Sequence, residues 1–317
     1  MNKKRIIILA VLILILTACK AEDKANINMP TAATTGALYP LGSALANLWN
    51  QNIENINVSA QASDGGIDNL NLLSIGEAQV SMAVISNVRD SYLGLGKFEN
   101  NKNPDLRIIA GLYLNPNQVV VSKTQNINSL SDLKDKRFVS GAPGSTTEEE
   151  AGIHLKASGL NYPEDLKIQN VGFTEAVDLM RNKMADGCWI MAGIPNSAVE
   201  QLLMTTDSKL ISIEDDIFEK LKAEYPFYIR YEIPANTYEK QSETIYTTAI
   251  KMVMFTDKNL DESIVYEMTK VFWENLDELS KTNKMLKDLD INTTLKDLAD
   301  IPIHDGAMKY YKEMGLK

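Results

Sequence analysis

The sequence predicts an α/β fold with two lobes, and three observations lead to this prediction. Short β-rich runs alternate with amphipathic helical segments along most of the chain, a pattern typical of mostly parallel sheets. The alternation starts again near residues 121–129, which indicates a second lobe. With 317 residues, the chain is long enough for one large domain or two ordinary domains with real cores.

The first half of the chain contains the first series of elements. Strands are expected at 25–32, 56–63, 79–86, 106–114 and 118–123. Two helices are expected between the first three strands because apolar side chains recur at helical spacing. Their apolar faces consist of Leu38, Leu41, Leu45, Leu48 and Trp49 in the first helix, and of Ile67, Leu70 and Leu73 in the second.

The second half opens with a short helix at 129–135 and a strand at 137–141. The segment 142–159 is predicted to be a turn and a helix that Gly159 closes. Further strands are expected at 167–172, 187–192, 209–213 and 248–256. Further helices are expected at 174–184, 195–206, 261–280 and 301–315.

The amino terminus has the form of an export signal. Three basic residues precede an apolar run from Ile6 to Leu16, which covers only about half of a ~30 Å hydrocarbon core. The run ends in "LTAC", which resembles a bacterial lipobox and implies cleavage before Cys19 and attachment of a lipid to it. An ordinary signal peptide with a chance cysteine is the alternative. We therefore expect a signal peptide at 1–18, a flexible tether at 19–25, and an exported, membrane-anchored lipoprotein that faces the periplasm or the cell exterior.

Composition restricts the classes of function. The formal net charge of −10 disfavours nucleic-acid binding, which depends on neutralising phosphates. With two cysteines and two histidines, a structural metal cluster is disfavoured, and Cys188 is expected to be a buried, inert thiol. The HExxH, GxSxG, GxGxxG and Walker motifs are absent from the sequence. We expect no catalytic residue, no metal and no cofactor.

Small polar residues and glycines follow several predicted strands, where open α/β sheets bind ligands. A helix that begins there also offers free N–H groups and a partial positive charge, which together can hold a small anion. Arg89 is the only arginine near these loops. The candidate ligand-binding residues are Thr34, Thr35, Tyr39, Ser63, Asp64, Gly65, Ser86, Asn87, Arg89, Tyr113, Gly144, Ser145, Thr146, Thr147 and Gly193.

Several of these residues also have a plainer explanation. Ser145 and Glu148 have the spacing of a capping box, and Gly65 with Gly66 fits a tight turn. Thr34, Thr35 and Asp64 could cap helices, and Arg89 could be an exposed surface charge. The functional interpretation depends on the same chemistry recurring at the same structural position.

Seven stretches, in order over nearly all of the chain after the signal, resemble the TAXI-type solute receptors of tripartite ATP-independent periplasmic (TRAP) transporters. They are "TGALYPLGSALANLWN", "QASDGGIDNLNLLSIGEA", "LRIIAGLYLNPNQVVV", "SLSDLKDKRFVSGAPGSTTEEE", "GFTEAVDLMRNKMADG", "YPFYIRYEIPANTY" and "PIHDGAMKYYKE". The combination is specific, although no single piece is.

The resemblance implies a two-lobed periplasmic-binding-protein fold, type II-like, with the ligand in the interlobe cleft. Lobe 1 would comprise 26–120 and 247–317, lobe 2 would comprise 121–246, and the crossovers would lie near Gln118–Ser122 and Thr247–Thr256. It further implies a binding protein, not an enzyme. It would capture a small organic anion, such as glutamate, 2-oxoglutarate or a similar dicarboxylate, and deliver it to TRAP permease subunits for uptake driven by an ion gradient.

The family's binding loops fall on 34–39, 63–66, 86–87 and 143–147 of this sequence. The chain departs from the family pattern in two places. The first loop, "TAATTGA", is poorer in glycine, and "SNVRDSYLG" is one residue short and carries Arg89 where a neutral residue is expected. Both departures affect the predicted pocket, so ligand identity stays open.

Two other functions remain open at this point. An exported enzyme on the same scaffold would need a general base near the cleft, and only Asp64 and Glu148 qualify. A lipoprotein that senses a ligand without any transport partner would have the same sequence features.

Overall fold

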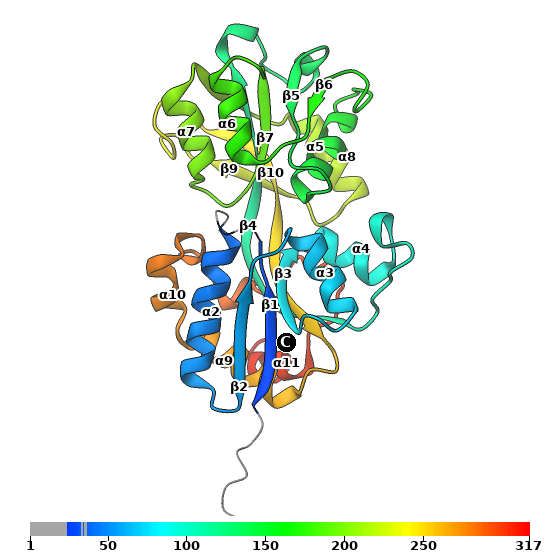
Figure 1. Ribbon diagram of the computed structural model, residues 1–317, viewed down its shortest axis with the longest axis vertical. Helices are drawn as coiled ribbons and strands as arrows, with labels where there is room; N and C mark the ends of the chain where they lie inside the picture. Colours follow the sequence, from blue (N-terminus) through cyan, green and yellow to red (C-terminus); the bar gives the residue numbers. More distant parts are fainter. Residues whose placement is uncertain (1–23, 33, 35–36) are drawn as a thin grey trace, which may run out of the picture.

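The computed structural model describes residues 24–32, 34 and 37–317, which fold into two lobes joined by two long strands (Figure 1). The α/β, two-lobed fold class predicted from the sequence is confirmed. The predicted signal peptide, Cys19, most of the predicted tether and Thr35 lie outside the described residues. Within the part that is described, no helix is long and apolar enough to cross a membrane.

The lower lobe in Figure 1 begins with three strand–helix units. In order they are β1 (Ala25–Pro30), α2 (Leu38–Asn52), β2 (Ile56–Gln61), α3 (Gly66–Ser74), β3 (Val80–Val84) and α4 (Ile85–Leu93). The helix α2 forms where the apolar spacing predicts it, and it buries Leu41, Leu45 and Trp49. The Trp49 indole N–H donates to the carbonyl of Met268 at 3.0 Å, which fastens this helix to the carboxyl-terminal part of the chain.

A single strand, β4 (Leu106–Ser122), then runs from the lower lobe into the upper one. The sequence predicted two strands here, at 106–114 and 118–123, and this prediction is wrong. The strand continues through Pro116, which pairs opposite Ala249 of β10 (Ile245–Asp257). Proline has no N–H to donate, but its carbonyl still accepts the N–H of Ala192 at 3.3 Å, so the strand does not need to end there.

The upper lobe contains the second series of elements. They are β5 (Arg137–Val139), α5 (Thr146–Ala157), β6 (Lys167–Gln169), α6 (Phe173–Arg181), β7 (Gly187–Met191), α7 (Ser197–Thr205) and β8 (Ser208–Ile211). The helix predicted at 129–135 is only one 3-10 turn, Ser131–Leu133. Two further elements of this lobe, α8 (Asp215–Glu224) and β9 (Ile229–Ile233), were not predicted. Helix α4 of the lower lobe was not predicted either, and its first two residues, Ile85 and Ser86, were wrongly expected to end the strand at 79–86.

After β10 the chain returns to the lower lobe and ends in helices packed on its sheet. The helix predicted at 261–280 is divided into α9 (Glu262–Glu274) and α10 (Leu276–Thr282). Asn275 separates them: its backbone leaves the helical conformation (φ −115°, ψ 16°), and its side-chain amide donates to the carbonyl of Val271 at 2.8 Å. The last helix, α11 (Asp305–Glu313), packs against α9 so closely that a Cβ on Gly306 would clash with the carbonyl oxygen of Glu262.

The strand pairing shows where one lobe gives way to the other. The larger sheet has the order β3-β10-β4-β7-β5-β6. Parallel pairs join β1 to β2 and β5 to β6 and β7, whereas every antiparallel pair includes β4 or β10. The partner of β4 changes from β10 to β7 between Pro116 and Asn117, and β10 leaves β9 at Ala249. We call residues 24–116 and 249–317 lobe 1 and residues 117–248 lobe 2. We call the two places where the chain passes between the lobes, Pro116–Asn117 and Thr248–Ala249, the hinge.

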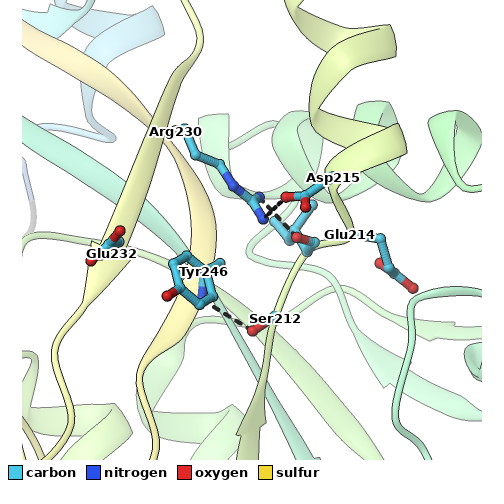
Figure 2. Close-up of a pocket in the computed structure, with 7 residues that line it drawn as sticks. Ser212, Glu214, Asp215, Arg230, Glu232 and Tyr246 are labelled. Atoms are coloured by element: carbon cyan, nitrogen blue, oxygen red, sulfur yellow. Dashed lines mark hydrogen bonds and ion pairs between the residues drawn. The ribbon is translucent and has the colours of Figure 1, made fainter.

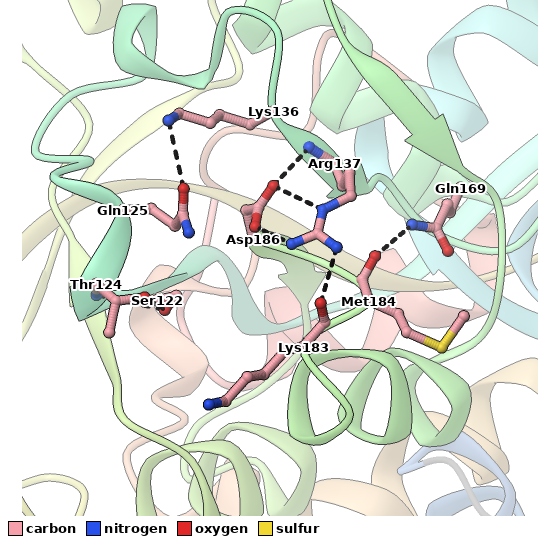
Figure 3. Close-up of polar contacts among 9 residues, drawn as sticks. All are labelled: Ser122, Thr124, Gln125, Lys136, Arg137, Gln169, Lys183, Met184 and Asp186. Carbon is pink, nitrogen blue, oxygen red and sulfur yellow. Dashed lines mark hydrogen bonds and ion pairs between the residues drawn. The ribbon is translucent and has the colours of Figure 1, made fainter.

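The amino ends of β5 and β7, at the end of lobe 2 far from the hinge, are fastened by an ion pair (Figure 3). The backbone N–H and Nε of Arg137 donate to Oδ2 of Asp186 at 2.9 and 3.0 Å, and an Nη donates to Oδ1. The other Nη donates to the carbonyl of Lys183 at 2.8 Å. These bonds from Arg137 hold the pKa of Asp186 below its ordinary value.

Candidate functional site

The carboxyl ends of the first three strands meet around one buried amide. Asn69 of α3 is fully buried, and its Nδ2 donates to the carbonyls of Thr31 at 2.8 Å and Met82 at 3.1 Å. Its Oδ1 accepts from the hydroxyl of Ser63 at 2.6 Å. Asn69 thereby joins the ends of β1, β2 and β3. The sequence analysis missed this residue, although a polar side chain beside Leu70 on an apolar helix face was a detectable signal.

The glycine loop places the start of α3 directly against the start of α4. Gly65 has φ +99°, a conformation that L side chains rarely adopt, and its N–H donates to the Ser63 hydroxyl at 3.2 Å. A Cβ on Gly66 would lie 3.0 Å from the Cβ of Ala83 and 3.8 Å from Oδ1 of Asn87. The neighbouring Asp64 is exposed, and its backbone N–H donates to Asp68 at 3.2 Å.

The two lobes touch at the amino ends of α4 and α5. Oγ1 of Thr146 donates to Oδ1 of Asn87 at 2.7 Å, and Nδ2 of Asn87 donates to Glu149 at 3.2 Å. Nζ of Lys97 donates to the carbonyl of Gly144 at 3.2 Å and lies 4.0 Å from the Glu149 carboxylate. We call these five residues the interlobe contact. Of them, sequence reasoning singled out Asn87, Gly144 and Thr146 and missed Lys97 and Glu149.

The amino end of α5 is capped by its own side chains. Ser145 is the N-cap and accepts the N–H of Glu148 at 3.2 Å. Glu148 in turn accepts the N–H of Gly144 at 2.6 Å and the side-chain amide of Asn170 at 2.8 Å. The predicted cap by Ser145 is confirmed, whereas Glu148 reaches back to Gly144, and the N–H of Ser145 donates to the carbonyl of Ala142. The backbone N–H groups of Thr146 and Thr147 have no hydrogen-bond acceptor among the described residues, so this helix end has two donors that a ligand could use.

Ser86 lies beside Asn87 in the first turn of α4 and is 8% exposed. Its hydroxyl is buried and has no hydrogen-bond partner within the part of the chain that the structure describes. A buried hydroxyl without a partner costs free energy, and such groups are rare in native proteins. A ligand that accepts from Ser86 would remove this cost.

The other predicted residues are placed as follows. The Arg89 guanidinium is paired with its neighbour Asp90 at 3.2 Å, and burial raises the pKa of that carboxyl group, with Glu149 adding to the effect. Thr147 is buried, Thr34 is exposed and Tyr39 is half-buried.

Tyr113 and Gly193 lie together, because a Cβ on Gly193 would be 3.5 Å from the Tyr113 ring. Burial raises the pKa of Tyr113 far above its ordinary value.

A cavity of about 440 Å³ lies elsewhere, between β8, α8, β9 and β10 (Figure 2). None of the predicted site residues lines it. Its one arginine, Arg230, donates to the carbonyl of Ile213 at 2.8 Å, is paired with Asp215 and lies over the rings of Phe218 and Tyr246. Because this guanidinium is already occupied, the cavity is a poor site for an anion.

No group of three or more histidine, cysteine or acidic side chains is placed to hold a metal ion in the described ranges. Neither of the two acids that the enzyme hypothesis would use has a histidine hydrogen-bonded to it there. Burial lowers the pKa of His154 to about 4, and it bonds to Glu150 and Thr248, while His304 caps α11.

Comparison with known proteins gives one family match, to the model described as the NMT1-like family, over residues 29–315. Solved structures that share the fold include the following three. The periplasmic aliphatic sulphonate-binding protein SsuA from Escherichia coli has 10% identity over 92% of this chain and 84% of its own, with a TM-score of 0.50. The sulfonate-binding SsuA from Methylobacillus flagellatus has 15% identity over 83% and 72%, with a TM-score of 0.52. A Xanthomonas citri protein solved with ATP has 9% identity over 92% and 96%, with a TM-score of 0.54.

Proposed function

The chain belongs to the NMT1-like family, and on that premise we propose that it is an extracytoplasmic solute-binding protein. In this proposal the gap between the lobes captures a small organic anion, such as glutamate, 2-oxoglutarate or a similar dicarboxylate. The protein then delivers the anion to a membrane permease and does not transform it. Export and a lipid on Cys19 would keep it beside that permease.

The observation that carries the proposal is the meeting of the amino ends of α4 and α5 across the two lobes. Three donors are unpaired there within the described residues: the Ser86 hydroxyl and the N–H groups of Thr146 and Thr147. Amides at a helix end also have a partial positive charge, so a carboxylate suits them. The partner of these donors would have contacts to both lobes and would therefore favour the closed form.

Charges near these donors narrow the ligand class. Lys97 and Arg89 supply positive charge, whereas Glu149 and Asp90 supply negative charge within the same region. An acid that also has an ammonium group could satisfy both signs, with its carboxylate on the amides and its ammonium near Glu149. Glutamate fits this description better than 2-oxoglutarate does.

The proposal also specifies the class of the permease. The resemblance of the seven stretches to TAXI receptors supports a TRAP permease driven by an ion gradient, while the Methylobacillus flagellatus relative is named as part of an ABC transporter. Uptake in cells that have this chain should stop when an ionophore collapses the gradient. If uptake instead follows cellular ATP with the gradient collapsed, the permease is of the ABC type.

A thermal-shift screen of the mature chain without its lipid tests the binding function. A ligand at about 100 times its Kd stabilises a protein by about 2.7 kcal/mol, which raises the Tm by about 2–4 °C in a chain of this size. We expect amino acids, dicarboxylates or oxo acids to give such shifts and to be recovered intact. A screen without any shift, or a hit that is converted to a product, would contradict the proposal.

A further inference from the structure

Helix α5 spans the distance between the interlobe contact and the hinge. Its first turn provides Thr146 and Glu149, which bond to Asn87 of lobe 1. Its next turns provide Glu150 and His154, which lie four residues apart and therefore on one face of the helix. Both side chains are fully buried at the hinge.

The hinge residues form a closed set of hydrogen bonds around this face of α5. Asn117 of β4 donates to Oε2 of Glu150 at 3.2 Å and to Oγ1 of Thr248 of β10 at 3.0 Å. The Tyr228 hydroxyl donates to the same Glu150 oxygen at 2.9 Å, and the Trp189 indole donates to Asn117 at 2.7 Å. We call Asn117, Glu150, His154, Tyr228 and Thr248 the hinge cluster.

His154 completes the cluster as a neutral ring. Its Nδ1 lies 2.7 Å from the Glu150 carbonyl, and its Nε2 lies 2.7 Å from Oγ1 of Thr248. A carbonyl can only accept, so Nδ1 bears the proton and Nε2 accepts from the Thr248 hydroxyl. The ring is neutral because burial lowers its pKa to about 4, so no positive charge faces the Glu150 carboxyl group from this side.

We propose that α5 couples the interlobe contact to the hinge, and that Glu150 is the positioning residue whose neutral carboxyl group holds α5 against both linking strands. The inference rests on the proposed function in one respect, namely that closure of the lobes accompanies ligand capture. It further states that closure of the lobes is coupled to protonation of Glu150. The closed form retains the proton on Glu150, and loss of the proton favours opening.

The charges around Glu150 define the pH range of the effect. Burial raises its pKa to about 8, Glu149 adds to the increase, and the bonds from Tyr228 and Asn117 oppose it. Tyr228 itself has a pKa well above its ordinary value, and the pKa of Tyr225 is about 12. Within the hinge cluster, the burial that raises the pKa of Tyr228 and lowers that of His154 moves both away from the range between about pH 6 and 9, so Glu150 is the group of the cluster that titrates there.

The sign of the pH effect follows from burial. An opening that admits water to the hinge reduces the desolvation, so Glu150 has a lower pKa in the open form than in the closed form. Closure therefore binds a proton, and it is favoured at lower pH, weakens as pH rises toward about 8 and is constant above that value. Each pH unit between the two pKa values corresponds to about a tenfold change in the closure equilibrium.

The test measures closure and binding separately. Spin labels on cysteines introduced at the exposed positions Ile75 in lobe 1 and Met184 in lobe 2 report the lobe separation without ligand. We expect the separation to widen in the wild type between about pH 6 and 8 and to be independent of pH in Glu150→Gln, whose neutral amide can accept the same bonds. Glu219→Gln removes the same charge on the exposed face of α8 and should behave as wild type.

Binding of 2-oxoglutarate, which has no amine to titrate, should weaken about tenfold over the same range in wild type but not in Glu150→Gln. Tyr228→Phe removes a bond that favours the charged form, so it should move the midpoint to higher pH even if Glu150→Gln fails to fold. A pH-independent wild-type separation, the wild-type response in Glu150→Gln, or an unmoved midpoint in Tyr228→Phe would overturn the proposal. If the separations are as expected but neither glutamate, 2-oxoglutarate nor a similar dicarboxylate binds, the result would count against the proposed function alone.

Discussion

The two ends of lobe 2 use polar groups in opposite ways. At the far end, Arg137 and Asp186 fasten the amino ends of β5 and β7, and the carboxylate accepts from two side-chain nitrogens and a backbone N–H (Figure 3). At the end that faces lobe 1, α5 begins with N–H groups that have no acceptor among the described residues, and Ser86 of lobe 1, next to Asn87, has a buried hydroxyl without a partner there. Paired groups stabilise the fold at one end, and unpaired donors are available to a ligand at the other.

Thr146→Pro should produce the largest effect on binding. Thr146 is the first residue of α5, a position that tolerates proline, and Ser145 has the extended backbone that proline requires of its predecessor. The change removes one N–H donor and the hydroxyl that bonds to Asn87, so affinity should fall roughly 100-fold. Glu262→Pro makes the matched change at the first residue of α9. Calorimetric titration should show normal affinity for this control, and equal losses in both variants would contradict the assignment.

Asp186→Ala should affect stability and leave binding unchanged. The Asp186 side chain is 8% exposed, and its removal leaves the Arg137 N–H without its acceptor. We expect the free energy of unfolding to fall by about 2 kcal/mol in urea denaturation. A weaker affinity in a variant that is still fully folded would mean that the far end of lobe 2 does influence the binding site.

The Arg137–Asp186 ion pair also makes a contribution to stability that depends on pH in the acid range and can be measured separately. Because Arg137 lowers the pKa of Asp186 in the folded chain, the pair stabilises above the ordinary pKa of about 4 and loses this effect as pH falls through the lowered value. Asp186→Asn should therefore reduce the loss of stability on acidification below about pH 4. Identical acid profiles for variant and wild type in thermal melts would contradict this attribution.

Asn87→Ala removes the side chain that bonds to both Thr146 and Glu149 across the lobes. The loss of one net hydrogen bond, about 1 kcal/mol, should weaken binding about fivefold. Unchanged affinity in calorimetry would show that the interlobe contact is not formed in the bound state.

Lys97→Met should have the smallest effect. Lys97 is exposed, and its distance to Glu149 is 4.0 Å, so binding should weaken only about twofold and the difference should vanish in high salt. A loss that is large and independent of salt would place Lys97 in direct contact with the ligand.

Much of the fold could be predicted because local patterns determine it. The spacing of Leu41, Leu45 and Trp49 predicted α2, and the Ser145–Glu148 spacing predicted the cap of α5. The continuity of β4 could not be predicted, because its passage through Pro116 depends on partners from β10 and β7 that are remote in sequence. The α9–α10 break lies at Asn275, whose side chain bonds back to its own helix, a contact that the apolar spacing of this segment does not indicate.

The candidate site was predictable only in part. Asn87 and Thr146 follow strands, so their position in the chain indicated them, and the structure brings them together. Glu149 and Glu150 lie inside a helix, where one sequence offers no sign that they bond across elements, and Asn69 is marked only by being a polar side chain on an apolar helix face. Thr34 and Asp64, which had the same signal as Asn87, are exposed.

A crystal structure of the mature chain with the ligand that gives the largest thermal shift tests the central claim most directly. We predict closed lobes, with a ligand carboxylate about 3 Å from the N–H groups of Thr146 and Thr147 and accepting from the Ser86 hydroxyl. A ligand found instead beside Arg230 and Tyr246, or anywhere without contact to both α4 and α5, would contradict the account.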